Sequence, residues 1–183
     1  MRLLIAGLAL FLGIHALPMV PSLRAALRAR WGEQRYKGVF SLLSAVGLAV
    51  VVIGYAVADD RARVFAPFPA ARAIAPFAMV ASFILVAAAN MRGHLRRILR
   101  HPMLLGLLIW ASVHLLANGD RAGTVMFGAF LAYAVVDLVS AIQRGAVKVF
   151  VPVPKHDLIA VVGGAAVAVA VMTYTPPPAS YVP

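Results

Sequence analysis

The sequence predicts an all-α polytopic integral membrane protein, with about six transmembrane helices in one bundle. Of its 183 residues, 63% are hydrophobic and 13% are charged, whereas about a quarter of an average soluble domain is charged. The apolar residues form continuous runs rather than the alternating pattern of a strand. Because hydrocarbon offers no partner for free backbone groups, such runs cross a membrane as helices.

Six apolar runs approach the roughly 20 residues that a helix needs to cross about 30 Å of hydrocarbon. They cover residues 3–20, 38–58, 73–90, 103–118, 123–142 and 158–174. The first run is similar to a signal peptide, but it has no A-x-A cleavage pattern and an Arg-rich stretch follows it, so we expect a retained helix. Residues 1–175 thus form one transmembrane helical domain, and residues 176–183 form an extended, proline-rich tail.

Between the first two runs, residues 22–35 have the spacing of an amphipathic helix. Leu23, Leu27 and Trp31 fall on one side of this helix, and arginines fall on another. An apolar stripe opposite a basic face is typical of a helix that lies in the membrane interface.

The positive charges predict the orientation of the chain. Seventeen Lys and Arg against six Asp and Glu give a net charge of +11, and most of the cations follow the first, third and fifth runs. Because short cytoplasmic loops carry the excess of Lys and Arg, we expect both termini on the periplasmic side of a bacterial inner membrane. A nucleic-acid binder would be far less apolar than a chain of mean hydropathy +0.92, so we expect membrane lipids as partners and no nucleic acid.

The absence of cysteine limits the chemistry of the chain. It excludes disulfides, thiolate metal ligands, the C-x-x-C-H site of covalently attached haem and a cysteine nucleophile. The apolar runs hold a single acid, which excludes the paired carboxylates of many hydrolases. Any bound metal is therefore held by His, Asp, Asn or Met side chains.

Three ionisable residues lie inside the apolar runs: His15, His114 and Asp137. A charge at the centre of a membrane helix costs roughly 2.5–3.5 kcal/mol, so each of these residues marks a candidate site. By residue count, both histidines fall near the middle of the bilayer on separate helices. Two neutral imidazoles at similar depth predict axial ligation of one haem iron. The alternative is that each imidazole binds a carbonyl or a serine of a neighbouring helix.

The helix that carries His114 has further polar and aromatic residues at helical spacing. Gly106, Trp110, His114 and Asn118 recur every four residues and predict one face on which a flat group can lie. Trp110 offers an aromatic surface there, and Asn118 offers an amide that orients a ring nitrogen or a polar ligand edge. The alternative is a face for helix packing. Asp137 is expected to pair with a basic residue or to hold the second nitrogen of a histidine.

The segment RGHLRRILRHP at residues 92–102 gathers four arginines and two histidines. Arg97 and His101 are four residues apart with Arg100 between them, and Pro102 then opens the fourth run at the positive end of its helix dipole. This arrangement predicts an anion site for lipid phosphates, for haem propionates or for the acidic groups of another cofactor.

Three stretches of the sequence resemble the NnrU-like membrane proteins. They read GIHALP at residues 13–18, RYKGVFSLLSAVG at 35–47 and AANMRGHLRRILRHPMLLGLLIWASVHLLANGD at 88–120. The family takes its name from genes linked to nitrite and nitric oxide reduction in denitrifying bacteria, and its plant relatives are 15-cis-zeta-carotene isomerases. The resemblance implies a six-helix fold, a non-covalent b-type haem, and a role in nitrogen-oxide metabolism or in isomerisation.

The resemblance also implies which residues bind the haem. The axial histidines of the isomerases fall on His15 and on His114, the second within the stretch IWASVH. The isomerases have a cysteine three residues before their second histidine, where this sequence has Ala111. A ligand-switching isomerase mechanism is therefore not expected.

Three functions are compatible with these residues. The first is a haem b protein ligated by His15 and His114, in which two axial ligands favour electron transfer. The second is a membrane methyltransferase that uses S-adenosylmethionine, since RHPMLLG at residues 100–106 is similar to isoprenylcysteine carboxyl methyltransferases, although acids are scarce late in this chain. The third is a non-catalytic factor that assembles with an oxidoreductase of the membrane or periplasm.

Overall fold

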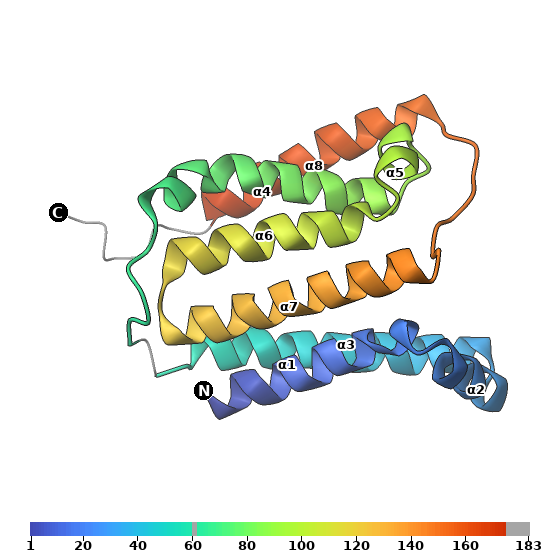
Figure 1. The fold of residues 1–183 in the computed structure, drawn as a ribbon, viewed down its shortest axis with the longest axis horizontal. Helices are drawn as coiled ribbons and strands as arrows, with labels where there is room; N and C mark the ends of the chain where they lie inside the picture. The colour runs from blue at the N-terminus through green and yellow to red at the C-terminus, as the bar shows by residue number, and fades with distance from the viewer. Residues whose placement is uncertain (60–61, 175–183) are drawn as a thin grey trace.

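The computed structural model describes residues 1–59 and 62–174, and this part of the chain is almost entirely helical. The long helices lie side by side along one direction (Figure 1): α1 (Arg2–His15), α3 (Glu33–Ala56), α4 (Pro69–Ala89), α6 (Pro102–Asn118), α7 (Arg121–Gln143) and α8 (Pro154–Tyr174). The shorter elements are the 3₁₀ turn η1 (Leu17–Met19), α2 (Pro21–Trp31) and α5 (His94–Leu99). The predicted tail at 176–183 lies outside the described residues.

The predicted all-α membrane fold is confirmed. Five helices of the described chain are long and apolar enough to cross a membrane, namely α1 with η1, α3, α4, α7 and α8. The fourth predicted span, which is α6 in the structure, is apolar but has only 17 residues. At about 1.5 Å per residue it covers roughly 25 Å, so it falls a little short of the hydrocarbon thickness.

Prolines and glycines set several boundaries differently from the predictions. α1 ends at His15, not at residue 20, because Pro18 and Pro21 lack the N–H groups that would continue its ladder. Helix α2 covers most of the predicted interfacial segment but ends at Trp31, because the next residue is Gly32, whose φ of 75° favours glycine. The basic segment at 92–102, which lies between two predicted spans, contains the short helix α5.

The helices form two groups that meet along α7 (Figure 1). α1 packs closely on α3, whereas α4 packs on both α6 and α8. α7 packs mainly on α6 and also touches α1 and α3. The buried apolar core joins the two groups and consists of Leu4, Leu8, Val51, Ala58, Ala111, Ala122, Met126, Phe127 and Phe130.

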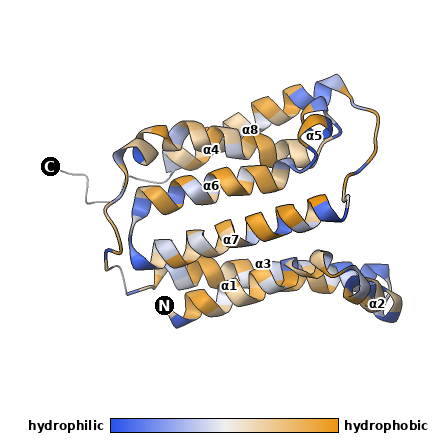
Figure 2. Cartoon of the chain, viewed as in Figure 1, coloured by the Kyte–Doolittle hydropathy of each residue, from blue (hydrophilic) through white to orange (hydrophobic). Residues whose placement is uncertain are grey.

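The helices are mostly apolar along their length, and hydrophilic residues gather near the ends of the bundle (Figure 2). Outward-facing side chains include Phe77, which is 77% exposed, and Leu158, which is 66% exposed. Apolar side chains on the outside of spanning helices are suited to contact with lipid. Helices α2 and α5 lie at the same end of the bundle (Figure 1), so the Arg-rich segments gather there. The side of the membrane that this end faces stays a prediction.

Glycines allow the backbones of α1 and α3 to touch. A Cβ atom at Gly54 of α3 would lie 2.5 Å from the backbone nitrogen of Leu4, and a Cβ at Gly47 would lie 2.9 Å from that of Phe11. From the other side, a Cβ at Gly7 of α1 would lie 2.6 Å from the nitrogen of Val51. Small residues at such positions let membrane helices approach closely, and this contact fixes α1 against the rest of the bundle.

We expect Gly54→Ala to lower the free energy of unfolding by about 1–3 kcal/mol, because the added methyl group meets backbone atoms that cannot move aside. Gly128→Ala is the matched control, since nothing lies within 4 Å of a Cβ added there. The control gains helix propensity worth up to about 1 kcal/mol and should not destabilise the fold. Denaturant unfolding in detergent, followed by circular dichroism, measures both variants, and equal stability of the two would contradict the close contact.

Candidate functional site

An apolar cavity of about 410 Å³ lies between the two groups of helices. Side chains of α1, α3, α4, α6 and α7 line it, and among them are His15, Ser82, Trp110, Tyr133 and Asp137. Its volume falls within the range of roughly 300–1,000 Å³ that is usual for small-molecule and cofactor sites. We call this space the apolar cavity.

His15 is the last residue of α1, and its half-buried imidazole lines the apolar cavity. Its Nδ1 lies 2.7 Å from the carbonyl oxygen of Phe11, one turn earlier in the same helix. A carbonyl only accepts hydrogen bonds, so Nδ1 carries the proton and Nε2 keeps its lone pair. The ring is held by three aromatic neighbours, with centroid distances of 4.2 Å to Phe11, 5.3 Å to Phe40 and 6.5 Å to Tyr133.

Asp137 connects the apolar cavity to the basic end of the bundle. The hydroxyl of Tyr133 lies 3.1 Å from Asp137 Oδ2 and 3.1 Å from the carbonyl oxygen of His15. On the other side, Arg144 lies 3.6 Å from Asp137 Oδ1 and donates to the carbonyl of Pro18 at 2.7 Å. Asp137 therefore has a basic partner, which was one of its two expected roles. These contacts tie the end of α1 and η1 to α7.

The α6 wall of the apolar cavity includes Gly106 and Trp110. A Cβ at Gly106 would lie 2.8 Å from the carbonyl oxygen of Ser82, so this glycine lets α6 approach α4. Ser82 also lines the cavity, is only 2% exposed, and has a hydroxyl oxygen with no hydrogen-bond partner. An unpaired buried hydroxyl costs about 1–3 kcal/mol unless a ligand satisfies it.

His114 and Asn118 lie outside the lining of the apolar cavity. Nδ1 of His114 is 2.9 Å from the carbonyl oxygen of Trp110, and its ring packs on Phe127 at a centroid distance of 4.9 Å. Asn118 donates from Nδ2 to the carbonyl of His114 at 2.7 Å. Four residues turn an α-helix by about 400°, so each residue of this series points about 40° away from the one before it. The four residues predicted on one face are therefore split between two directions.

The structure does not bring the rings of His15 and His114 into contact. A chain of aromatic neighbours connects them through Phe11, Phe130 and Trp110, with successive centroid distances of 4.2, 5.8, 5.4 and 5.2 Å. His114 packs on residue 127 of α7 and His15 packs near residue 133. Six residues of helix correspond to about 9 Å along its axis, so the two imidazoles contact α7 at different levels. Their shared ligation of one iron stays a prediction.

The predicted anion residues divide between two neighbouring pockets at the end of the bundle. Arg100 and His101 line one pocket of about 310 Å³, and Arg97 lines the other. Arg96, which the sequence did not single out as a site residue, joins Arg100 and His101, and so does Lys148 from the segment between α7 and α8. Arg100 has a φ of 60°, a rare conformation for a residue other than glycine.

Sequence reasoning also missed most of the groups around His15. Phe11 precedes His15 by four residues, and Tyr133 precedes Asp137 by the same spacing, so helical periodicity was the signal available for both. Ser82 gave no such signal, because a single serine in an apolar run is usually bonded within its own helix. Arg144 donates to the carbonyl of Pro18, which is 126 residues away in the sequence, so no local pattern indicated its role.

A comparison with protein-family models matches residues 3–181 of this chain to the family described as NnrU protein. The match covers both candidate histidines, the apolar cavity and the basic segment between α4 and α6. No curated protein and no solved structure matches the chain.

We expect Arg144→Gln to lower the free energy of unfolding by about 1 kcal/mol, since it loses a charged hydrogen bond and a partly exposed ion pair. Arg97→Gln removes the same charge from an exposed position on α5 and serves as the control. Thermal unfolding in detergent compares the two. If Arg144→Gln and Asp137→Asn destabilise additively in the double variant, Arg144 and Asp137 do not interact.

Proposed function

Because this chain belongs to the NnrU protein family, we propose that it is a haem b-binding membrane protein that acts in redox or nitrogen-oxide chemistry. The observation that carries the proposal is the imidazole of His15, which lines an apolar cavity and keeps Nε2 free to bind a metal. A histidine whose Nδ1 is held by a carbonyl is the usual form of a metal ligand, because that bond fixes both the tautomer and the orientation of the ring.

The donor set favours a porphyrin over a bare metal ion. Among the described residues, no group of three or more His, Cys, Asp or Glu side chains is placed to hold a metal. A bare ion such as zinc takes about three or four protein ligands. Haem iron needs only one or two axial ligands from the protein, which a single imidazole can supply.

The apolar cavity also suits a flat apolar group. Aromatic side chains of Phe11, Phe83, Trp110 and Phe130 surround it, and its few polar atoms belong to His15, Ser82, Tyr133 and Asp137. The unpaired hydroxyl of Ser82 comes from α4, whereas His15 comes from α1. A polar group of a bound molecule would satisfy that hydroxyl.

The geometry favours His15 as the single protein ligand. At metal–nitrogen distances of about 2 Å, two imidazoles on one iron have their ligand nitrogens about 4 Å apart. In this chain, three aromatic side chains connect the two histidines, and His114 does not line the apolar cavity. Haem b held by His15 alone would keep a coordination position open, and it would supply binding of a small molecule such as nitric oxide, together with electron transfer.

We expect His15→Ala to lose the haem absorption band of the protein purified in detergent, because His15 is the one imidazole that lines the apolar cavity in the described part of the chain. The measurement is the reduced-minus-oxidised spectrum, with haem quantified per protein. Added imidazole should restore the band by occupying the space of the missing ring. Wild-type protein that is folded and supplied with haem yet shows no band would overturn the proposed function.

His114→Ala is the matched control, since His114 is also a helical histidine whose Nδ1 faces a carbonyl four residues earlier. We expect this variant to retain the haem. Loss of haem in both variants, each still folded by circular dichroism, would instead support ligation by both histidines and contradict a single protein ligand.

We expect the reduced wild-type protein to bind carbon monoxide without displacing a protein ligand, because a haem held by His15 alone would keep a coordination position open. The spectral shift on mixing should appear in a single step whose rate rises linearly with gas concentration. A rate that levels off at high concentration would indicate that a bound side chain must leave first, as in a six-coordinate centre, and would contradict the open position.

A further inference from the structure

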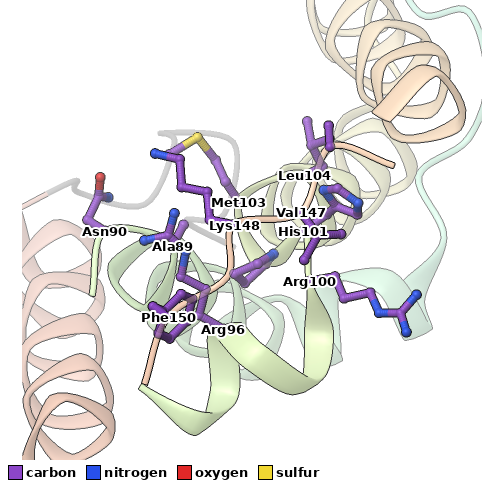
Figure 3. Close-up of a pocket in the computed structure, with 12 residues that line it drawn as sticks. Ala89, Asn90, Arg96, Arg100, His101, Met103, Leu104, Val147, Lys148 and Phe150 are labelled. Carbon is purple, nitrogen blue, oxygen red and sulfur yellow. The ribbon is translucent and has the colours of Figure 1, made fainter. Parts of the chain in front are cut away.

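A second pocket, of about 310 Å³, lies at the Arg-rich end of the bundle (Figure 3). It is bounded by the end of α4, by α5, by the first turn of α6 and by the segment between α7 and α8. Its cationic side chains are Arg96, Arg100 and Lys148, with His101 beside them. We call it the cationic pocket.

The cations of this pocket lack a counter-ion within it. Across residues 1–59 and 62–174, no carboxylate lines the cationic pocket. Three of the acids pair elsewhere: Glu33 with Arg28 and Lys37, Asp137 with Arg144, and Asp157 with His94 and the first turn of α5. Cations gathered in a recess without an acid attract anions, and the effect is strongest where the walls have a low dielectric constant.

Two contacts hold the side chain of Arg96 in place. Its guanidinium group lies 5.5 Å from the centre of the Phe150 ring, and it donates to the carbonyl of Met91 at 3.4 Å. The side chain is half-buried, so its charge is only partly hydrated. Such a stacked guanidinium keeps further N–H groups for an anion, and planar N–H pairs suit phosphate oxygens. Arg100, by contrast, extends away from Arg96 in Figure 3.

The cationic pocket adjoins the apolar cavity. Met103 and Leu104, in the first turn of α6, line both spaces. Met103 is also 47% exposed on the outside of the bundle. A molecule with its anion at Arg96 would therefore have an apolar surface next to it, where the headgroup layer of a membrane meets hydrocarbon.

We propose that the cationic pocket binds the headgroup phosphate of an anionic phospholipid, with its acyl chain running past Met103. Charge complementarity selects the phosphate, and the adjoining apolar surface selects a lipid over a soluble anion. This site does not include His15 and does not depend on haem binding.

The test measures lipid binding by native mass spectrometry on the full-length protein in detergent. The probes are phosphatidylglycerol, the zwitterionic phosphatidylcholine and inorganic phosphate. We expect phosphatidylglycerol to bind most tightly of the three. Arg96→Gln and Lys148→Gln should each weaken phosphatidylglycerol binding about 5-fold, because a cation near a lipid surface contributes about 1 kcal/mol. Arg97→Gln is the matched control, because it removes the same charge one residue along α5 from a side chain that does not line the pocket.

Three results would overturn the proposal. Equal binding of phosphatidylglycerol and phosphatidylcholine would show that the phosphate charge is not recognised, and equal losses in Arg96→Gln and Arg97→Gln would show diffuse attraction instead of a site. Tight binding of inorganic phosphate alone would assign the pocket to a soluble anion. Phosphatidylglycerol binding by His15→Ala is measured in parallel. Because this variant alters the proposed haem site and not the cationic pocket, the lipid proposal and the proposed function can fail independently.

Discussion

Polar side chains inside the apolar layer must find their partners within the chain, because hydrocarbon supplies none. This constraint accounts for most of the candidate site. His15 and His114 each use the carbonyl four residues earlier in their own helix, and Asp137 is satisfied by Tyr133 and Arg144. Within the described chain, Ser82 is the buried polar side chain whose oxygen stays without a partner, and it lines the same cavity as His15.

The position of His15 depends on two contacts of α1. Glycines on both helices allow α1 to lie directly on α3, which sets its distance from the core. The hydrogen bonds of Tyr133 and Arg144 to the carbonyls of His15 and Pro18 then hold its end against α7. Backbone contact and side-chain hydrogen bonds together place one imidazole in the wall of the apolar cavity, whereas His114 packs on α7 away from it.

The two pockets have different physical characters although they share Met103 and Leu104. One is surrounded by aromatic and aliphatic side chains at the level of the spanning helices, and the other is surrounded by cations where those helices end. This division follows from the membrane, because placing a charge in the hydrocarbon layer costs much more free energy than placing it near the headgroups. It separates the apolar cavity from the cationic pocket within one bundle.

The sequence by itself determined the membrane class, the approximate position of all the long helices and the Arg-rich end of the bundle, because these follow from apolar length and charge, which are local properties. It also singled out His15, Trp110 and Asp137, all of which line the apolar cavity. Only the tertiary structure decided that His114 and Asn118 lie outside the lining of this cavity. It also decided that Arg96, and not Arg97, lines the same pocket as Arg100. Tyr133, Ser82 and Arg144 joined the candidate site only through the structure. These facts depend on the rotation of each helix about its axis and on contacts between distant segments, and neither is encoded in the spacing of residues along one helix.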